Sequence, residues 1–309
     1  MPRDFQQIEW DVAVEDDLRQ LVRLGVREDL GRQYDWTTVA LVPADTQGRA
    51  AVVAREAGVL AGLRAAPVLI DEMQAAIDWR PHGADGDQVT AGAIAAELTG
   101  SARDMLTCER PLLNLLSRLS GIATLTHQYV RRIEGTPARI YDTRKTTPGY
   151  RRLEKYAVRC GGGHNHRTGL FDAVLIKDNH LALAAEENLY PADAVRAARK
   201  FLQQMGEENL DKGLLIEIEI ERVEQLDDVL AAGPDIVLLD NMSPDQLRAA
   251  VARRDEVAPH IELEASGSVS LENVRDIALA GVERISLGRL THSARWLDLA
   301  LDWQPPAGP

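Results

Sequence analysis

A short stretch of the sequence, residues 236–246, reads IVLLDNMSPDQ and decides the fold. Its first four residues are apolar, which is typical of a buried strand, and Asp240 ends the apolar run. Ser243, Pro244 and Gln246 then have the spacing of a capping box with proline at the first helical position, which predicts that a helix begins here. A buried strand that is followed at once by a helix is the repeating unit of a parallel α/β sheet.

Other segments repeat this pattern of a short apolar strand, and most of them are followed by a helical segment. Such alternation predicts a parallel sheet. No Gly-x-Gly-x-x-Gly motif follows these strands, and about six or seven strand–helix units favour an α/β barrel, with the open doubly wound sheet as the alternative. Residues 186–213 are long for a single barrel crossover. The other strands are expected at residues 140–144, 173–177, 214–220, 261–265 and 284–287.

The residues before this region have a different pattern. A helical opening at 15–30 precedes strand-like runs at 49–55 and 93–98, which are separated by turns, and this mixture predicts an α+β unit. From Glu109 to Val130, apolar residues recur at helical spacing, which predicts a long and largely covered helix between two domains.

Composition excludes several classes of protein. The 309 residues include 35 basic and 48 acidic side chains, and the net charge of −13 would repel a nucleic-acid backbone. No apolar run is long enough to span a membrane, and the opening residues lack the apolar core of a signal peptide, so we expect a cytoplasmic protein with no membrane partner. Cys108 and Cys160 predict neither a disulfide framework nor a thiolate zinc site.

Polar residues stand where the predicted strands end. Because the carboxyl ends of parallel strands meet at one edge of a barrel, we expect these residues to gather around a single mouth. Catalytic groups of such barrels come from this edge. The polar segments are residues 142–145, 177–180, 240–241 and 264–267.

Two predicted strands carry glutamates at alternating positions. Glu217, Glu219 and Glu221 share one face, and Glu262 and Glu264 repeat the arrangement. An isolated segment of this kind could be a half-solvated antiparallel strand, but inside a parallel sheet both faces are covered. Buried carboxylates cost several kcal/mol unless a cation compensates them. The candidates are Arg144, Lys145, Arg167 and Lys177, or a divalent metal held by Glu219 and Asp240 together with substrate phosphate.

A glycine-rich segment, residues 160–167, lies between a predicted helix and a predicted strand. Its three glycines would permit close approach of the backbone to a ligand. His164 and His166 are not favoured as a metal pair, because no third histidine or cysteine has a suitable spacing, and a histidine that contacts substrate is expected instead. Residues 266–268 and Gly288 resemble the late-strand phosphate sites of barrels.

Taken together, these segments resemble the quinolinate phosphoribosyltransferase family. The resemblance covers almost the whole chain. Its weaker parts are residues 58–62, 86–89 and 117–121. The specific motifs are DTRKTTPG at 142–149, LEKYAV at 153–158, GGGHNHR at 161–167, LIKDNH at 175–180, LLDNM at 238–242 and EASG at 264–267.

The resemblance implies a two-domain α/β fold. An incomplete α/β barrel of the TIM type would occupy residues 116–289, and an open-faced α/β sandwich would be formed by residues 1–115 and joined by the carboxyl-terminal segment 290–309. It also implies a homodimer, in which Arg110 reaches into the site of the neighbouring subunit.

The resemblance also implies the reaction and its residues. Quinolinate and phosphoribosyl pyrophosphate would give nicotinate mononucleotide, pyrophosphate and CO2, with Mg2+ as cofactor. Arg144, His166, Arg167 and Lys177 would hold quinolinate, and Lys145 would lie near the pyrophosphate. Glu219 and Asp240 would address the ribose hydroxyls and the magnesium, and together with Lys145 and Lys177 they are the candidate catalytic residues. The remaining substrate-binding candidates, mostly for the 5′-phosphate, are Ser266, Gly267, Ser268, Gly288 and His292.

Two departures from the family pattern stand out, and two other functions stay open. Tyr34 precedes Asp35 where the family usually has glycine, and Ser268 replaces a second glycine after Gly267. One alternative is a related enzyme of the same fold that acts on another heterocyclic acceptor. The other is a barrel that binds a phosphorylated metabolite without catalysis.

Overall fold

The computed structural model describes residues 4–183, 190–205 and 214–304, and these divide into two compact units. The first, which we call the parallel-sheet unit, contains the described residues of 1–7, 128–144 and 164–288. The second, the antiparallel-sheet unit, contains those of 8–127, 145–163 and 289–309. The sequence suggested boundaries after residues 115 and 289. The chain in fact passes between the two compact units at more points than these.

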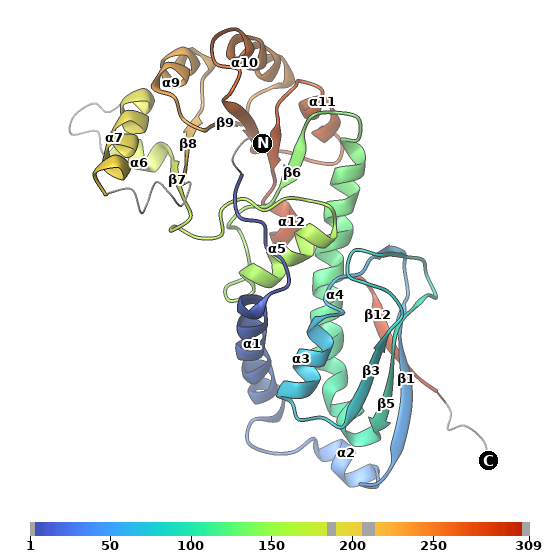
Figure 1. Cartoon of the computed structure of the whole chain (residues 1–309). Helices are drawn as coiled ribbons and strands as arrows, with labels where there is room; N and C mark the ends of the chain where they lie inside the picture. Colours follow the sequence, from blue (N-terminus) through green and yellow to red (C-terminus); the bar gives the residue numbers. More distant parts are fainter. Residues whose placement is uncertain (1–3, 184–189, 206–213, 305–309) are drawn as a thin grey trace. The chain divides into compact units, whose positions relative to one another are not determined.

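The parallel-sheet unit is built on one six-stranded sheet in which every ladder is parallel (Figure 1). The strand order is β6-β11-β10-β9-β8-β7, so each strand after β7 lies beside its predecessor and β6 lies beside β11. The predicted parallel sheet is confirmed. The strands are β6 (Arg139–Tyr141), β7 (Ala173–Ile176), β8 (Leu215–Ile220), β9 (Ile236–Asp240), β10 (Glu262–Ser266) and β11 (Arg284–Ser286).

Helices connect these strands and lie on one side of the sheet, as Figure 1 shows for α7, α9, α10 and α11. The capping box is present, because the Ser243 side chain accepts from the Gln246 N–H and the Gln246 side chain accepts from the Ser243 N–H. Of the predicted crossover 186–213, residues 191–204 form α7, and 186–189 and 206–213 lie outside the described residues. The helical elements are α6 (Asp178–Leu183), α7 (Pro191–Gln204), η2 (Val223–Gln225), α9 (Leu226–Ala232), α10 (Pro244–Val257) and α11 (Val274–Ala278).

The other face of the sheet encloses a core to which the chain's first described residues contribute. Phe5 packs in one buried cluster with Tyr141, Ala173, Leu215 and Ile236, which come from four different strands. Glutamates stand on the same face, since strand partners in a parallel ladder point the same way and Glu217 is paired with Ile236. The half-solvated antiparallel alternative for this glutamate strand is therefore wrong.

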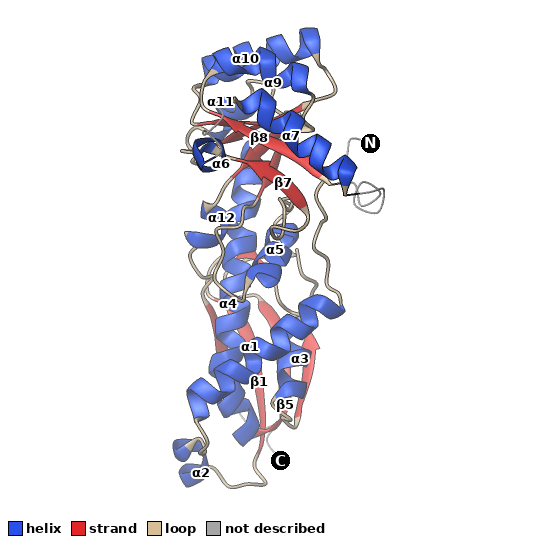
Figure 2. Cartoon of the chain, turned by 90° about the vertical axis from the view of Figure 1, so that its left-hand side faces the viewer, coloured by secondary structure: helices blue, strands red, loops and turns tan. Residues whose placement is uncertain are grey.

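The antiparallel-sheet unit combines a four-stranded antiparallel sheet, in the order β12-β1-β5-β3, with a two-stranded β2-β4 ladder. Helices α1 and α3 pack against each other beside this sheet (Figure 2). The predicted helix at 109–130 is part of the longer α4. The elements are α1 (Val12–Leu30), α2 (Trp36–Leu41), β1 (Gln47–Ala54), β2 (Gly58–Val59), α3 (Ala65–Glu72), β3 (Ile77–Pro81), β4 (Gln88–Val89), β5 (Ile94–Ser101), α4 (Ala102–Arg132), α5 (Arg151–Cys160), α12 (Arg289–His292) and β12 (Leu299–Trp303).

Within the described ranges, no helix combines the length and the apolar character that crossing a bilayer requires.

Candidate active site

Most of the predicted site residues gather at the carboxyl-terminal edge of the parallel sheet. Asp240 ends β9 and is paired in register with Ser266, the last residue of β10. Arg144, Lys177 and Gly288 follow the ends of β6, β7 and β11, and Glu219 lies near the end of β8. Parallel strands that start at one edge must end at the other, so residues that are far apart in sequence share this edge.

Lys177 and Glu219 form an ion pair at this edge. The ammonium of Lys177 donates to Oε2 of Glu219, and the lysine side chain keeps 40% of its surface exposed while the glutamate keeps 11%. The ammonium is therefore reachable from solvent, and its charge is offset by a carboxylate on the neighbouring strand. Mixed charge of this kind can bind an anion without leaving an uncompensated cation in the empty site.

The loops after β9 and β10 are tied together by Asn241. Its backbone N–H donates to Ser266 O at 3.0 Å, and its Oδ1 accepts from the Ser268 N–H at 3.0 Å. Asn241 also donates from Nδ2 to Asp240 Oδ2 at 2.8 Å, and its φ of 52° lies in the left-handed region. Gly267 is required here, because its φ is 112° and a Cβ would lie 2.2 Å from Asn241 Oδ1. Serine at 268 fits, since its hydroxyl also donates to Asn241 Oδ1, at 3.3 Å.

The glycines at 161 and 163 serve packing on a helix rather than approach to a ligand. A Cβ on Gly161 would lie 2.4 Å from Ala123 O, and one on Gly163 would lie 2.7 Å from a methyl group of Thr126. Both neighbours belong to α4. The three-glycine signal in the sequence therefore has a structural cause in the antiparallel-sheet unit.

The residues that follow these glycines run beside β6. The N–H of His164 donates to Ile140 O at 2.7 Å, and the N–H of Asp142 donates to His164 O at 3.0 Å. Asp142 is completely buried, and its carboxylate accepts from Asn165 Nδ2 at 2.7 Å and from the His166 N–H at 2.9 Å. These hydrogen bonds fix the backbone from which His166 and Arg167 project.

His166 is buried, and both nitrogens of its ring face groups of the protein. Nδ1 accepts from the backbone N–H of Arg167 at 2.8 Å, while Nε2 lies 3.0 Å from Glu217 Oε2 and 3.6 Å from Glu264 Oε1. The Phe5 ring stacks on the imidazole with 4.2 Å between centroids. Since Nδ1 accepts, the proton of the neutral ring must lie on Nε2, where it faces the two carboxylates.

Glu217 and Glu264 face the His166 ring, and sequence reasoning gave neither of them an individual role. Both are completely buried. Burial, and next the nearby charge of Glu217, raise the pKa of Glu264 well above its ordinary value of 4.5, although His166, Ser286 and Arg284 counteract the effect. The alternating glutamates were the available signal, since they placed both side chains on the covered face of the sheet.

His166, Glu217 and Glu264 are also a group whose ligand atoms all lie within 4.8 Å of one another, which is the spacing of a metal site. The hydrogen bond at Nδ1 argues against a metal there, because it leaves the proton on Nε2 and so occupies the lone pair that would bind the ion. The arrangement is therefore that of a histidine whose Nε2 faces two acids.

Arg167 provides a buried positive charge beside this group. Its side chain reaches Ala173 O at 3.4 Å, and among the described residues it has no ion pair within 4.0 Å. Burial, followed by the nearby positive charge of Arg144, lowers the pKa of the Arg167 guanidinium. Two guanidiniums that lie close enough to affect each other are suited to an anion with more than one negative charge.

Three predicted site residues belong to the antiparallel-sheet unit. Arg110, Lys145 and His292 are exposed there. The backbone of Lys145 is fixed within this unit, since its carbonyl accepts from the Thr291 hydroxyl at 2.7 Å. The loop that follows is held by buried Glu154, which accepts from the Thr147 N–H at 3.1 Å and pairs with a guanidinium from α4.

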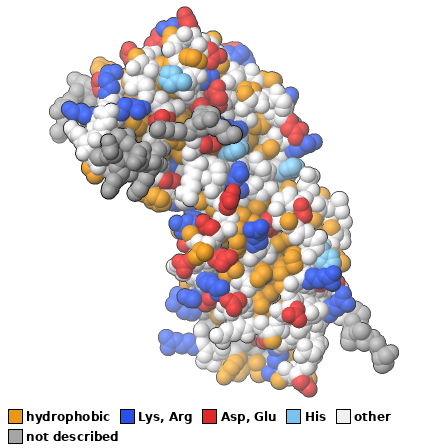
Figure 3. Space-filling model, in the orientation of Figure 1, with side chains coloured by type: hydrophobic (Ala, Val, Ile, Leu, Met, Phe, Trp, Pro, Cys, Tyr) orange, Lys and Arg blue, Asp and Glu red, His pale blue; other side chains and the backbone are white. Residues whose placement is uncertain are grey.

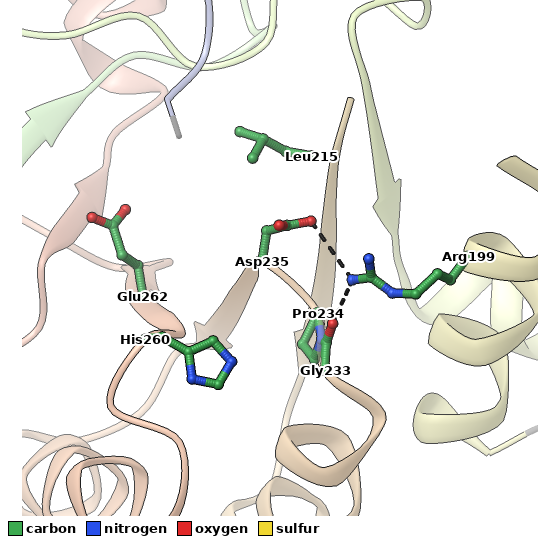
Figure 4. A pocket seen from close by; sticks show the side chains of 7 residues that line it. All are labelled: Arg199, Leu215, Gly233, Pro234, Asp235, His260 and Glu262. Carbon is green, nitrogen blue, oxygen red and sulfur yellow. Dashed lines mark hydrogen bonds and ion pairs between the residues drawn. The ribbon is translucent and has the colours of Figure 1, made fainter. Parts of the chain in front are cut away.

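A pocket of about 290 Å³ lies at the opposite edge of the sheet (Figure 4). Leu215, Asp235 and Glu262, which line it, stand at or just before the amino-terminal ends of β8, β9 and β10. No predicted site residue lines it. Arg199 is paired there with Asp235 and with the carbonyl of Gly233, as Figure 4 shows.

Known proteins share both the sequence and the fold. The model of the quinolinate phosphoribosyl transferase N-terminal domain matches residues 35–120, and that of the C-terminal domain matches residues 122–302. The nicotinate-nucleotide pyrophosphorylase [carboxylating] of Mycobacterium leprae is 44% identical over 289 residues, which are 93% of this chain and 97% of the relative. A probable enzyme of the same name from Bacillus subtilis is 40% identical over 92% of this chain and 93% of its own.

A solved structure extends the likeness to three dimensions. The nicotinate-nucleotide pyrophosphorylase from Francisella tularensis superimposes with a TM-score of 0.86 at 36% identity, over 97% of this chain and all of the other. The chain belongs to the quinolinate phosphoribosyltransferase family.

Proposed function

We propose that this protein transfers the phosphoribosyl group of phosphoribosyl pyrophosphate to quinolinate and decarboxylates the adduct, giving nicotinate mononucleotide, pyrophosphate and CO2. The observation that carries this proposal is the opposition of basic and acidic side chains at one sheet edge, where Lys177 meets Glu219. Both substrates are polyanions, so basic groups must offset their mutual repulsion, and acidic groups must stabilise the cation that forms when the sugar loses its leaving group. The family relationship supports the same reaction.

Quinolinate occupies the half of the site formed after β6 and β7. Arg144, Arg167 and Lys177 supply positive charge for its two carboxylates, and His166 belongs to the same half. The buried guanidinium of Arg167 supports this assignment, because no carboxylate of the described residues pairs with it. Arginine can hold a carboxylate through two parallel hydrogen bonds, which also fixes the orientation of the ring.

Phosphoribosyl pyrophosphate occupies the half formed after β8 to β11. Glu219 and Asp240 address the ribose hydroxyls. The 5′-phosphate is received after the last two strands by Ser266, Gly267, Ser268 and Gly288, because the loops at this edge of a parallel α/β sheet are where anions commonly bind. Lys145 and His292 bind the same substrate, with Lys145 near the pyrophosphate.

Magnesium is the expected cofactor, and the residues at this edge fit it. Glu219 and Asp240 lie on neighbouring strands and offer carboxylate oxygens, and Mg2+ is usually held by one or two carboxylates together with substrate phosphates. When bound, the ion would take up negative charge on the leaving pyrophosphate.

The reaction proceeds in two steps. The ring nitrogen of quinolinate attacks the anomeric carbon while the bond from that carbon to pyrophosphate breaks, and the pyrophosphate leaves with the electron pair. Carboxylates at the site stabilise the oxocarbenium character of the sugar, and positioning of two repelling anions in line contributes up to about 7–11 kcal/mol in ideal cases. The ring nitrogen is now cationic, so the adjacent carboxylate departs as CO2, its electron pair stays on the ring, and a proton replaces it.

The family resemblance also supports a proposal about the architecture and the assembly. We infer that the six-stranded sheet is an incomplete barrel, which its single direction of winding supports, since an open doubly wound sheet reverses its strand order. The antiparallel-sheet unit is the open-faced sandwich. The protein acts as a homodimer, in which Arg110 of one subunit serves the site of the other.

The test is product analysis. Protein incubated with quinolinate, phosphoribosyl pyrophosphate and magnesium is expected to release CO2 and nicotinate mononucleotide in equal amounts. Folded protein that forms neither product contradicts the proposal. A panel of pyridine carboxylates and other heterocycles identifies a different acceptor if one of them outcompetes quinolinate, and ligand binding without turnover identifies a non-catalytic barrel.

A further inference from the structure

Two acidic residues beneath the site, Glu217 and Glu264, have no part in the reaction as described. Both are completely buried on the inner face of the parallel sheet. Burying an ionised carboxylate costs several kcal/mol in practice, so two of them side by side call for an explanation. Among the described residues, the oxygens of Glu217 accept no hydrogen bond, and the His166 ring is the group that pairs with this carboxylate, with Nε2 at 3.0 Å from Oε2.

His166 connects these acids to the substrate-binding arginine. Its Nε2 faces Glu217 and Glu264, while its Nδ1 accepts the backbone N–H of Arg167. Each contact limits how the ring can turn, and the stacked Phe5 ring closes the face of the imidazole. A shift of the imidazole would therefore move the backbone from which Arg167 projects.

Charge links the same residues. The negative charge of Glu217 favours the protonated guanidinium of Arg167 and so opposes the effects of burial and of the neighbouring Arg144. An arginine that is 7% exposed needs such compensation before a substrate arrives.

We propose that Glu217 and Glu264 are positioning residues for quinolinate, which act through His166 to hold Arg167 in its binding orientation. The inference rests on the proposed function, because it takes Arg167 to be the group that binds a quinolinate carboxylate. On this view His166 contributes to binding by orienting its neighbour, since both of its nitrogens are engaged within the protein.

Glu262 offers a matched control on the same strand. It lies two residues before Glu264 on the same face of β10, but its carboxylate pairs with Arg139 at 2.9 Å and with the buried guanidinium of Arg284. Among the contacts of the described residues, none joins this carboxylate to the His166 ring or to Arg167. Glu262→Gln thus removes a largely buried carboxylate from the same strand face, while the direct contacts of the His166 ring with Glu217, Glu264 and Arg167 stay in place.

The experiment compares steady-state kinetics of Glu217→Gln, Glu264→Gln and Glu262→Gln with those of the unchanged protein. The two positioning variants are expected to raise KM for quinolinate by about tenfold or more, with KM for phosphoribosyl pyrophosphate within about twofold. Glu262→Gln is expected to lower thermal stability and leave KM for quinolinate within about twofold. Equal rises in both KM values, or none for quinolinate, would overturn the inference.

A double-mutant cycle separates positioning from general damage. In an Arg167→Lys background, Glu264→Gln is expected to add less than about threefold to KM for quinolinate, because the group that it positions is already altered. If Glu264→Gln raises KM for quinolinate by the same factor in this background as in the unchanged protein, the inference is overturned. If Glu217→Gln does not fold, Glu217→Asp takes its place, and unchanged KM for quinolinate in that variant would count equally against it.

These outcomes are distinct from failure of the proposed function. If the unchanged protein forms no nicotinate mononucleotide, the proposed function fails and the inference fails with it. If it does turn over and the glutamate variants behave like Glu262→Gln, only the inference fails.

Discussion

At Gly267 the absence of a single carbon atom allows two loops to meet. The φ of 112° is one that L-residues rarely adopt, and the space beside it is filled by Oδ1 of Asn241. Asn241 in turn holds Ser266 and Ser268 through its backbone N–H and its side chain. The proposed phosphate-binding loop therefore depends on one backbone conformation and one side-chain amide.

Gly267→Ala is expected to weaken binding of phosphoribosyl pyrophosphate. The new Cβ adds backbone strain of about 1–3 kcal/mol and also displaces Asn241, so KM for this substrate should rise by about tenfold or more. Gly135→Ala is the control, because Gly135 also has a positive φ of 81° but nothing lies within 4 Å of its Cβ position. Comparable kinetic effects in the two variants, measured alongside thermal unfolding, would contradict this account.

For single residues, the sequence predicted the position of charged side chains that have few reasons to stand at a strand end. It did not predict contacts with partners that are distant in the sequence. Lys177 and Glu219 were expected at a shared edge, and the structure pairs them. Glu217 was placed on the covered face, but its contact with His166 joins positions 51 residues apart by number, which no local pattern reveals. The glycines at 161 and 163 suggested a ligand because sequence does not show that a helix passes beside them.

Among the elements, the short helix α2 shows how one side chain sets a boundary. Asp35 is its N-cap, and its carboxylate accepts from the backbone N–H and the hydroxyl of Thr38. These bonds, the hydroxyl first, lower the pKa of Asp35 below its ordinary value of 3.8. Tyr34, where the family usually has glycine, does not have a positive φ, so the departure brings no backbone strain.

Asp35→Asn is expected to make stability less dependent on pH in the acid range. Because the folded carboxyl has a lower pKa than the unfolded one, its ionisation stabilises the fold. This contribution is complete above about pH 4 and is lost as the pH falls through the lower, folded value. Thermal unfolding from pH 7 to pH 3 should show the largest advantage of the unchanged protein at neutral pH, and an advantage that grows on acidification would refute the assignment.

The elements themselves were well predicted where periodicity and capping agree. The stretch 236–246 gives a strand that ends at Asp240 and a helix that begins at Pro244, as expected. The chain's entry into the parallel-sheet unit at residues 4–7 was not foreseen, since a few residues without periodicity carry no signal of their tertiary partners.

On the scale of the molecule, acidic residues outnumber basic residues by 13. On the face drawn in Figure 3, basic and acidic side chains are interspersed over the described residues. A net charge of −13 disfavours approach of anionic substrates at long range, so their capture must depend on the local cations at the sheet edge. Screening by salt limits the long-range repulsion to about 8 Å under physiological conditions.

Phe5 packs in the core of the parallel-sheet unit, so the stability of this unit depends on the first described residues. Phe5→Ala is expected to lower the free energy of unfolding by about 3–5 kcal/mol, because a buried ring is removed from between His166 and the sheet strands. It should also raise KM for quinolinate, because the imidazole loses its stacking partner. Phe5→Leu, which retains most of the volume, should cost less than about 1.5 kcal/mol. Denaturant unfolding checks both, and equal losses would contradict a packing role.

Asp4 has a consequence for how the chain is made. Its carboxylate accepts from Arg284, which follows 280 positions later, and from the hydroxyl of Tyr141. At about 5–20 residues per second, a ribosome would synthesise Arg284 roughly 14–56 s after Asp4. Asp4 can pair with Arg139 once 135 further residues are made, but its contact with Arg284 must wait through most of translation. This part of the interior of the parallel sheet therefore closes late on the nascent chain.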